Sequence, residues 1–315
     1  MSRQIPVILD TDIGTDIDDT WALAMMLNSP ELDVKLVTSD TGDTIYRAKL
    51  LARMLEVAGR ADIPVGIGIR QCEDPNGPQA RWVKGYDLHS YPGTVHQDGV
   101  GAIVDMLMEA PDPVTLIAIG PVPNLAAALD LEPRIAERTR FVGMYGDLYG
   151  GHPDQPGVMP EYNVRADPAA AQRVFTAPWD MTITPLDTCG RVRLTGEKYR
   201  AVRDCPKPLP RAVIENFRIW TETIKWQDRW GPKPDPEEIS SVLFDTVAIY
   251  LAFAEDLLVM EDLGIRVTDN GFTVIDAAAR TVHCATQWKD LAGFEDLLVQ
   301  RMIGIREPRS RKAPP

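Results

Sequence analysis

The sequence predicts an α/β fold, a single domain with an open, mainly parallel, Rossmann-like sheet flanked by helices. Short apolar runs typical of strands alternate with helix-like segments through most of the first 190 residues, an order that predicts parallel strand pairing. Five strand-like runs end in polar or glycine-rich turns, "LDTDIGTDIDD", "VTSDTGD", "AIGPVPN", "GMYGD" and "TPLDTCG". Ligands of such sheets bind outside the carboxyl ends of the strands, so we expect the site at these turns.

The individual elements follow from apolar periodicity and from end signals. We expect strands over 5–9, 34–38, 63–68, 114–119, 140–144 and 180–186. We expect helices over 18–30, 44–59, 100–110, 124–131 and 167–175. The helix at 18–30 is apolar nearly all round and should be buried. Gly59 marks a helix end, and Asp167 with Pro168 marks a helix start.

The remaining segments carry weaker signals. Residues 70–98 are rich in Pro, Gly, Asp and His, which is typical of a functional loop or a lid. Beyond residue 190 the pattern is mostly helical, and Asn270-Gly271 predicts a hairpin over 265–276. No repeat or linker interrupts the chain, so we expect one domain over 1–305, followed by a disordered basic tail over 306–315.

Composition excludes several classes of partner. The net charge is -13, from 33 basic and 46 acidic residues, which argues against a nucleic acid or an anionic membrane. No apolar run approaches the ~18 residues of a membrane span, and the amino terminus does not resemble a signal peptide. The four cysteines lie far apart without a CxxC pair, which favours reduced thiols and a cytoplasmic location over zinc or disulfides.

A dense group of acids lies between two apolar segments, in "VILDTDIGTDIDDTWALAMML" (7–27). Its members are Asp10, Asp12, Asp16, Asp18 and Asp19. Clustered carboxylates resist ionisation beside one another, and a hard divalent cation such as calcium removes that conflict. A solvated acidic turn at a helix start is the plainer alternative, but helix capping does not need five acids. A haloacid dehalogenase-type phosphatase also opens with DxD, but "IGTDIDD" fits that pattern poorly.

The chain resembles the nucleoside hydrolases of the inosine-uridine preferring type. "LDTDIGTDIDDTWALAMM" looks like their N-terminal signature. Further resemblances follow in the family's order, at "SDTGDT", "VHQDGV", "IGPVPNLAAAL", "GMYG", "PEYNVRADPAAAQRVF", "PLDTCG" and "LFDTVAIYLAF". They span roughly residues 5–276. The resemblance implies calcium-dependent hydrolysis of the N-glycosidic bond of a small-molecule ribonucleoside, the nucleoside hydrolase fold, and a homodimer or homotetramer.

The resemblance also implies site residues. Ca2+ would be bound by Asp12, Asp19 and Asp245 and by the backbone carbonyl of Pro123, where the family usually has Thr. Asp12 would also be the general base for calcium-bound water, with Asp10 orienting the site from behind. Ribose hydroxyls would be held by Asp18, Asp43, Glu161 and Asn163, with Met144 against the sugar ring. Ribose should therefore be preferred over 2′-deoxyribose.

The half of the site that would hold the base departs from the family. Many members have a leaving-group His directly before the metal-binding Asp, where this chain has Phe244. His96 matches a family His near the base and is our candidate for the acid, with His89 or the loop around Tyr86 and Tyr91 as alternatives. His152 and His283 are expected at the surface or in the core, and Asp16 in a solvent-facing turn.

Aromatic side chains can stack on a nucleobase, and the helical segment 211–230 carries Trp220, Trp226 and Trp230. Trp226 is our candidate for that contact. Two alternatives to a ribonucleoside hydrolase stay open, a hydrolase of another N-riboside with an unusual aglycone, and a non-catalytic nucleoside or ribose binder. The intact Asp12, Asp18 and Asp19 speak against the binder.

Overall fold

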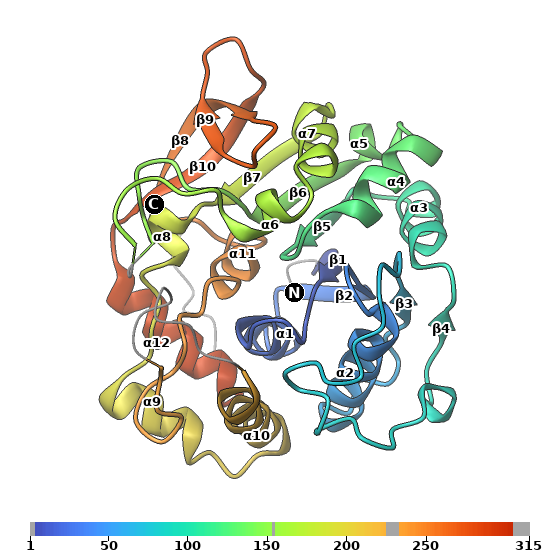
Figure 1. The fold of residues 1–315 in the computed structure, drawn as a ribbon, viewed down its shortest axis with the longest axis vertical. Coiled ribbons are helices and arrows are strands. Elements are labelled where there is room, and N and C mark those ends of the chain that lie inside the picture. The colour runs from blue at the N-terminus through green and yellow to red at the C-terminus, as the bar shows by residue number, and fades with distance from the viewer. Residues whose placement is uncertain (1–3, 153–154, 225–232, 305–315) are drawn as a thin grey trace, which may run out of the picture.

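The strands of the protein form one sheet. The computed structural model describes residues 4–152, 155–224 and 233–304 (Figure 1). Its strands are β1 (Ile5–Thr11), β2 (Leu32–Ser39), β3 (Val65–Ile67), β4 (Val95–His96), β5 (Val114–Ala118), β6 (Thr139–Met144), β7 (Asp180–Thr184), β8 (Leu258–Val267), β9 (Thr273–Ile275) and β10 (Thr281–Trp288). They lie in the order β4-β3-β2-β1-β5-β6-β7-β10-β8-β9. Every pair from β4 to β10 is parallel, and β8 and β9 add an antiparallel edge.

Helices cover both faces of this sheet. They are α1 (Asp18–Leu27), α2 (Thr44–Val57), α3 (Gly99–Glu109), α4 (Pro123–Leu131), α5 (Ile135–Arg138), α6 (Tyr162–Ala166), α7 (Pro168–Thr176), α8 (Leu186–Cys189), α9 (Gly196–Arg203), α10 (Pro208–Thr223), α11 (Thr246–Leu251) and α12 (Leu291–Met302), with a 3-10 turn η1 (Leu88–Ser90). Figure 1 shows α3, α4, α5 and α7 on one side of the sheet and α1, α2, α10 and α12 on the other. Among the described residues, no helix has the length and apolarity that a membrane span requires.

The predicted fold class is confirmed, and each expected strand and helix has a counterpart within a few residues. The elements that were not predicted include β10, α12, η1 and β4. The mostly helical reading beyond residue 190 overlooked β10, which pairs parallel to β7, and the helix α12 that follows it. The expected hairpin is present as β8 and β9. The loop at 70–98 contains η1 and the short edge strand β4. The predicted basic tail, 306–315, lies outside the described residues.

The core lies on both faces of the central strand β1. Val7 and Leu9 join the apolar cluster under α1 and α2, whereas Ile8 joins the cluster under α3 and α4, because successive side chains of a strand alternate. Helix α1 is buried along nearly its whole length, as its apolar sequence predicts. It packs between the sheet and helices α10, α11 and α12. The start of α1 is thereby fixed at the carboxyl end of β1.

The segment 70–98 is anchored to the helices beside it. The Trp82 indole N–H donates to the Glu215 carboxylate of α10 at 3.1 Å, and Arg81 pairs with Glu222 on the same helix. Gln79 is fully buried, and its side-chain amide donates to the Asp16 carbonyl at 3.2 Å. These contacts bind the segment to α10 and to the turn before α1.

The central strand gives a direct test of this packing. Leu9 is 0% exposed, so Leu9→Ala should lower the free energy of unfolding by about 2–5 kcal/mol through lost burial and a residual cavity. Leu131, which is 67% exposed at the end of α4, is the matched control. Leu131→Ala should change the free energy of unfolding by less than ~0.5 kcal/mol. Urea unfolding measures both values. Equal losses in the two variants would contradict the assignment of β1 to the core.

Candidate functional site

A cavity of about 350 Å³ lies at the carboxyl ends of β1, β5 and β6. Parallel strands end at the same edge of a sheet, so Asp12 after β1, Ile119 after β5 and Met144 at the end of β6 come together there. The volume is within the usual range for small-molecule sites. Its lining residues are Asp12, Thr15, Asp16, Asp18, Asp19, Ile119, Met144, His152, Met159, Glu161, Tyr162, Asn163, Arg165, Leu186, Arg193, Trp220, Ile224, Pro234, Ser241, Val242, Phe244 and Asp245.

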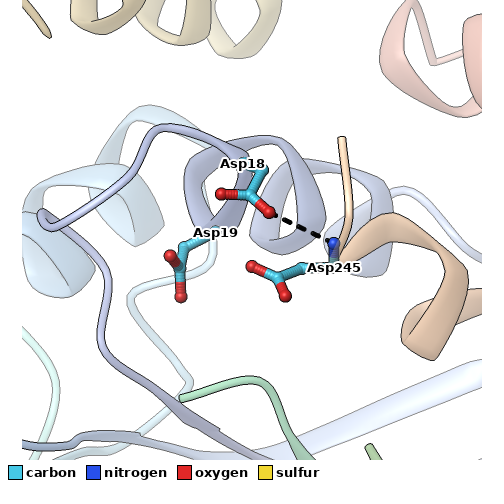
Figure 2. Close-up of side chains that lie close together, drawn as sticks. All are labelled: Asp18, Asp19 and Asp245. Carbon is cyan, nitrogen blue, oxygen red and sulfur yellow. Dashed lines mark hydrogen bonds between the residues drawn. The ribbon is translucent and has the colours of Figure 1, made fainter. Parts of the chain in front are cut away.

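Three buried carboxylates face one another in this cavity. Asp18 and Asp19 open helix α1, and Asp245 immediately precedes helix α11 (Figure 2). One oxygen of each carboxylate lies within 4.8 Å of the others. The backbone N–H of Asp245 donates to Asp18 Oδ2 at 3.3 Å, and the Thr11 hydroxyl donates to Asp19 Oδ1. These bonds tie the ends of β1, α1 and α11 to one another.

The electrostatics of this group are unfavourable for ionised carboxylates. Burial raises the pKa of Asp18, Asp19 and Asp245 well above the usual carboxyl value, and the charges of neighbouring aspartates raise it further. A divalent cation with oxygen ligands would remove both penalties, since it supplies positive charge and replaces lost hydration. The residues present fit such an ion, and the group can bind a metal.

Asp12 lies beside this group on a turn held by a buried arginine. Arg47, on α2, is 7% exposed, and its guanidinium donates to the backbone carbonyls of Asp12, Ile13 and Thr41. Burial raises the pKa of Asp12, and the nearby Arg47 charge opposes that shift. Arg47 thus holds the backbone of this turn, and the Asp12 side chain lines the cavity.

Two further aspartates lie behind the cavity. Asp10 Oδ1 accepts from the Thr38 hydroxyl at 2.5 Å and from the Asn124 amide at 2.9 Å, and burial raises its pKa to about 6. Asp40, at the end of β2, is also buried, and burial together with the charges of Asp10 and Asp12 raises its pKa well above the usual value. One carboxylate oxygen of each has no hydrogen-bond partner among the described residues. Asp40 was not among the predicted site residues, although the turn "SDTGD" that contains it was expected at the site.

A second polar group forms the opposite wall. Glu161 caps α6, where its carboxylate accepts from the backbone N–H groups of Asn163 and Val164, and it also accepts from Gly146. Burial raises its pKa to about 7. The Asn163 amide donates to the Met144 carbonyl at 3.1 Å. Met144, Glu161 and Asn163 thus come together at the ends of β5 and β6, as the sequence predicted for a shared site.

Other expected residues lie elsewhere. Asp43 caps α2, and its carboxylate also accepts from Arg70 and from the Asp74 N–H. His96 pairs with Gly66 on the edge strand β4, and Pro123 starts α4. None of Asp43, His96 and Pro123 belongs to the cavity lining. His89 is an exposed residue of η1. Trp226, the expected stacking residue, and Trp230 lie outside the described residues.

The structure adds lining residues that sequence reasoning overlooked. Asp16 was expected to face solvent, but it is partly buried and lines the cavity, and burial raises its pKa to about 6. His152 was expected at the surface or in the core, but it lines the cavity beside Phe244, with ring centroids 6.2 Å apart. Arg193 and Tyr162 also line it. No motif signalled His152, because "GGHPDQPGVMP" matches no pattern.

The position of Asp43 favours a structural role over contact with ribose. Burial alone would raise its pKa, but hydrogen bonds from the Asp74 N–H and from Arg70 outweigh it and lower the pKa. Asp43→Ala should therefore cost about 1 kcal/mol of folding free energy through loss of the cap, and leave ribonucleoside affinity unchanged. Urea unfolding and calorimetric titration measure the two effects. Asp43→Asn, which keeps a capping oxygen, should recover most of the stability. A loss of ribonucleoside affinity in a variant that keeps full stability would instead support a contact between Asp43 and ribose.

Known proteins resemble this chain over nearly its whole length. Residues 7–295 match the family described as "Inosine-uridine preferring nucleoside hydrolase". A protein of that name from Leishmania major is 30% identical, over 96% of this chain and 99% of its own length. A pyrimidine-specific ribonucleoside hydrolase from Citrobacter koseri is 28% identical, over 95% of this chain and 98% of its own.

Solved structures agree on the fold. A plant nucleoside hydrolase superposes with a TM-score of 0.78 at 23% identity, over 96% of this chain and 99% of its own. A purine-preferring ribonucleoside hydrolase from Gardnerella vaginalis gives 0.77 at 21% identity, over 95% and 98% of the two chains. The chain therefore belongs to the nucleoside hydrolases, enzymes that cleave N-glycosidic bonds.

Proposed function

We propose that the protein hydrolyses the N-glycosidic bond of ribonucleosides to free base and ribose, with Ca2+ as its metal. The observation that carries the proposal is the cavity itself, in which buried aspartates face the pair formed by Glu161 and Asn163. Such a set of carboxylate and amide groups suits a vicinal diol, whose hydroxyls can donate to acids and bind a cation. Family membership supports the same class of reaction.

For the metal we propose Asp12, Asp19 and Asp245 and, from the family resemblance alone, the carbonyl of Pro123, which lies outside the cavity lining. Asp19 and Asp245 belong to the buried group described above, and the Asp12 charge raises the pKa of both. Ca2+ is favoured over zinc because the donors are oxygens, and over Mg2+ because several protein carboxylates take part. When bound, the cation polarises a water molecule and the sugar hydroxyls next to it.

The chain's own residues would divide the remaining work. Asp12 accepts a proton from the attacking water, because its carboxylate lines the cavity and is buried. Asp18, Glu161 and Asn163 bind ribose hydroxyls, and Met144 packs against the ring. The acids also stabilise positive charge that develops on the sugar as the bond to the base breaks. We further propose a cytoplasmic location, which the cysteine content favours, and a homodimer or homotetramer, which the family resemblance implies.

Measurements of turnover test both the proposed reaction and the role of Asp12 as general base. The wild-type protein with Ca2+ should release ribose from at least one ribonucleoside in a panel of purine and pyrimidine substrates, and more slowly from the 2′-deoxy analogue. Asp12→Asn should lower kcat/KM by about 10²–10⁴-fold, because the side chain keeps its shape but cannot accept the proton. Asp105→Asn, an exposed substitution on α3, is the matched control and should keep wild-type rates. A near-normal rate for Asp12→Asn would exclude Asp12 as the base.

Metal binding can be tested without turnover. Ca2+ at about 100 times its Kd should stabilise the wild-type fold by about 2.7 kcal/mol, since the unfolded chain lacks the site. Asp245→Asn should lose that gain, yet be at least as stable as the wild type in chelator, because one buried, repelling carboxylate is gone. Thermal unfolding with and without Ca2+ measures this, with Asp105→Asn as the control. An equal gain in Asp245→Asn would contradict the assignment.

A further inference from the structure

The lining of the cavity also contains apolar side chains that the proposed mechanism leaves without a role. Besides the acids, it includes Met159, Leu186, Trp220, Val242 and Phe244. A ribose bound by the acidic residues leaves these side chains for the base, since flat heterocycles pack well on apolar and aromatic side chains. We call these five residues the base pocket. When the bond to the sugar breaks, a neutral nucleobase departs as an anion unless a group in this pocket protonates it.

One imidazole lies at the base pocket. All four histidines of the chain fall within the described residues, and only His152 lines the cavity. His283 instead pairs with Asp262 and Glu255 on the far antiparallel edge. The His152 ring lies against Phe244, the residue directly before Asp245, with the two ring planes 32° apart. His152 therefore lines the cavity beside one of the five base-pocket residues.

The loop that carries His152 is fixed by two carboxylates. Asp147 is fully buried and accepts from the N–H groups of Gly150, Gly151 and Met159 at 2.8–2.9 Å. Asp187 accepts from the N–H groups of the two residues after Asp147, at 2.8 and 2.9 Å. Gly151 lies so close to Asp187 that a Cβ there would come within 2.1 Å of its backbone. The backbone directly before His152 is thus held in place against β7 and α8.

Other lining groups are poorer proton donors for a base. Arg165 and Arg193 carry guanidinium groups, which suit hydrogen bonds to an anion and not the transfer of a proton. Tyr162 is 40% exposed, and burial raises its pKa to about 12. Burial raises the pKa of Glu161 to about 7, but its two carboxylate oxygens are held by three backbone N–H groups beside Asn163, where the proposed function places a ribose hydroxyl. An imidazole gives up a proton near neutral pH and is the usual side chain for this step.

We propose that His152 is the acid that protonates the departing base, an inference that rests on the proposed function. As the bond between C1′ and the base nitrogen breaks, its electron pair goes to the base, and a proton from the His152 ring is transferred to a base nitrogen. Water forms the new bond to C1′ and gives its proton to Asp12. Exchange with solvent returns the proton from Asp12 and reprotonates His152, so the net reaction is nucleoside plus water to base plus ribose.

The test compares two leaving groups on one sugar. Inosine or uridine needs protonation to leave, whereas p-nitrophenyl β-D-ribofuranoside releases a stable anion. His152→Ala and His152→Gln should lower kcat/KM on the nucleoside by about 10²–10⁴-fold and change it less than ~5-fold on the aryl riboside. The retained aryl activity also reports that each variant is folded. His89→Ala, an exposed histidine outside the cavity, is the matched control and should keep both activities.

Each outcome separates the two proposals. Selective loss on the nucleoside supports His152 as the acid. Equal losses on both substrates, or no loss on either, would overturn this role while leaving the proposed hydrolysis intact. A wild-type protein that hydrolyses neither substrate with Ca2+ would instead refute the proposed function.

Discussion

The burial of several carboxylates side by side is the constraint on which the site depends. Asp12, Asp18, Asp19 and Asp245 are each at most 4% exposed, and Asp10 and Asp40 are buried behind them. Burial alone would keep such groups protonated, because a charge loses hydration and gains repulsion. The parallel sheet offers partial compensation. Its helices start at the carboxyl ends of the strands, so their N-termini point toward the cavity.

Several helix starts contribute to this compensation. Asp18 and Asp19 occupy the first turn of α1, Asp245 precedes α11, and Glu161 caps α6. Each helix N-terminus carries unpaired N–H groups and the positive end of the helix dipole, and these stabilise negative charge within the first turn. The effect is modest, about 0.3–1 kcal/mol for each group, and cannot neutralise a cluster. Arg47 adds positive charge but binds backbone carbonyls instead of the acids. The remaining negative charge is what makes a divalent cation the natural complement of this cavity.

The sequence predicted what local pattern and strand order determine. The alternation of strands and helices predicted the sheet, and the resemblance brought Asp245 to Asp18 across 227 residues. Neither signal predicted β10, because the mostly helical pattern beyond residue 190 obscured this strand. For Asp43, the same Gly-Asp spacing is compatible with a helix cap and with a ribose contact, and the sequence does not say which way the carboxylate turns. His152 was not expected in the cavity because its place depends on hydrogen bonds that loop N–H groups donate to Asp147 and Asp187, which no local pattern encodes.

The cavity has two parts, the acids and the base pocket, and their residues differ in how freely they can be substituted. The acids belong to strand ends and helix starts in the core, where a shift of one residue would break the sheet register or a helix cap. The base pocket is formed largely by connecting segments, including the loop that carries His152 and the residues before α11. Loops tolerate substitution far better than core elements. Relatives named for inosine and uridine, for pyrimidines and for purines share this fold. Because the acids that we propose to bind the sugar are fixed by the fold and the base pocket is not, we expect base preference in this chain to be determined by the loop residues around Phe244.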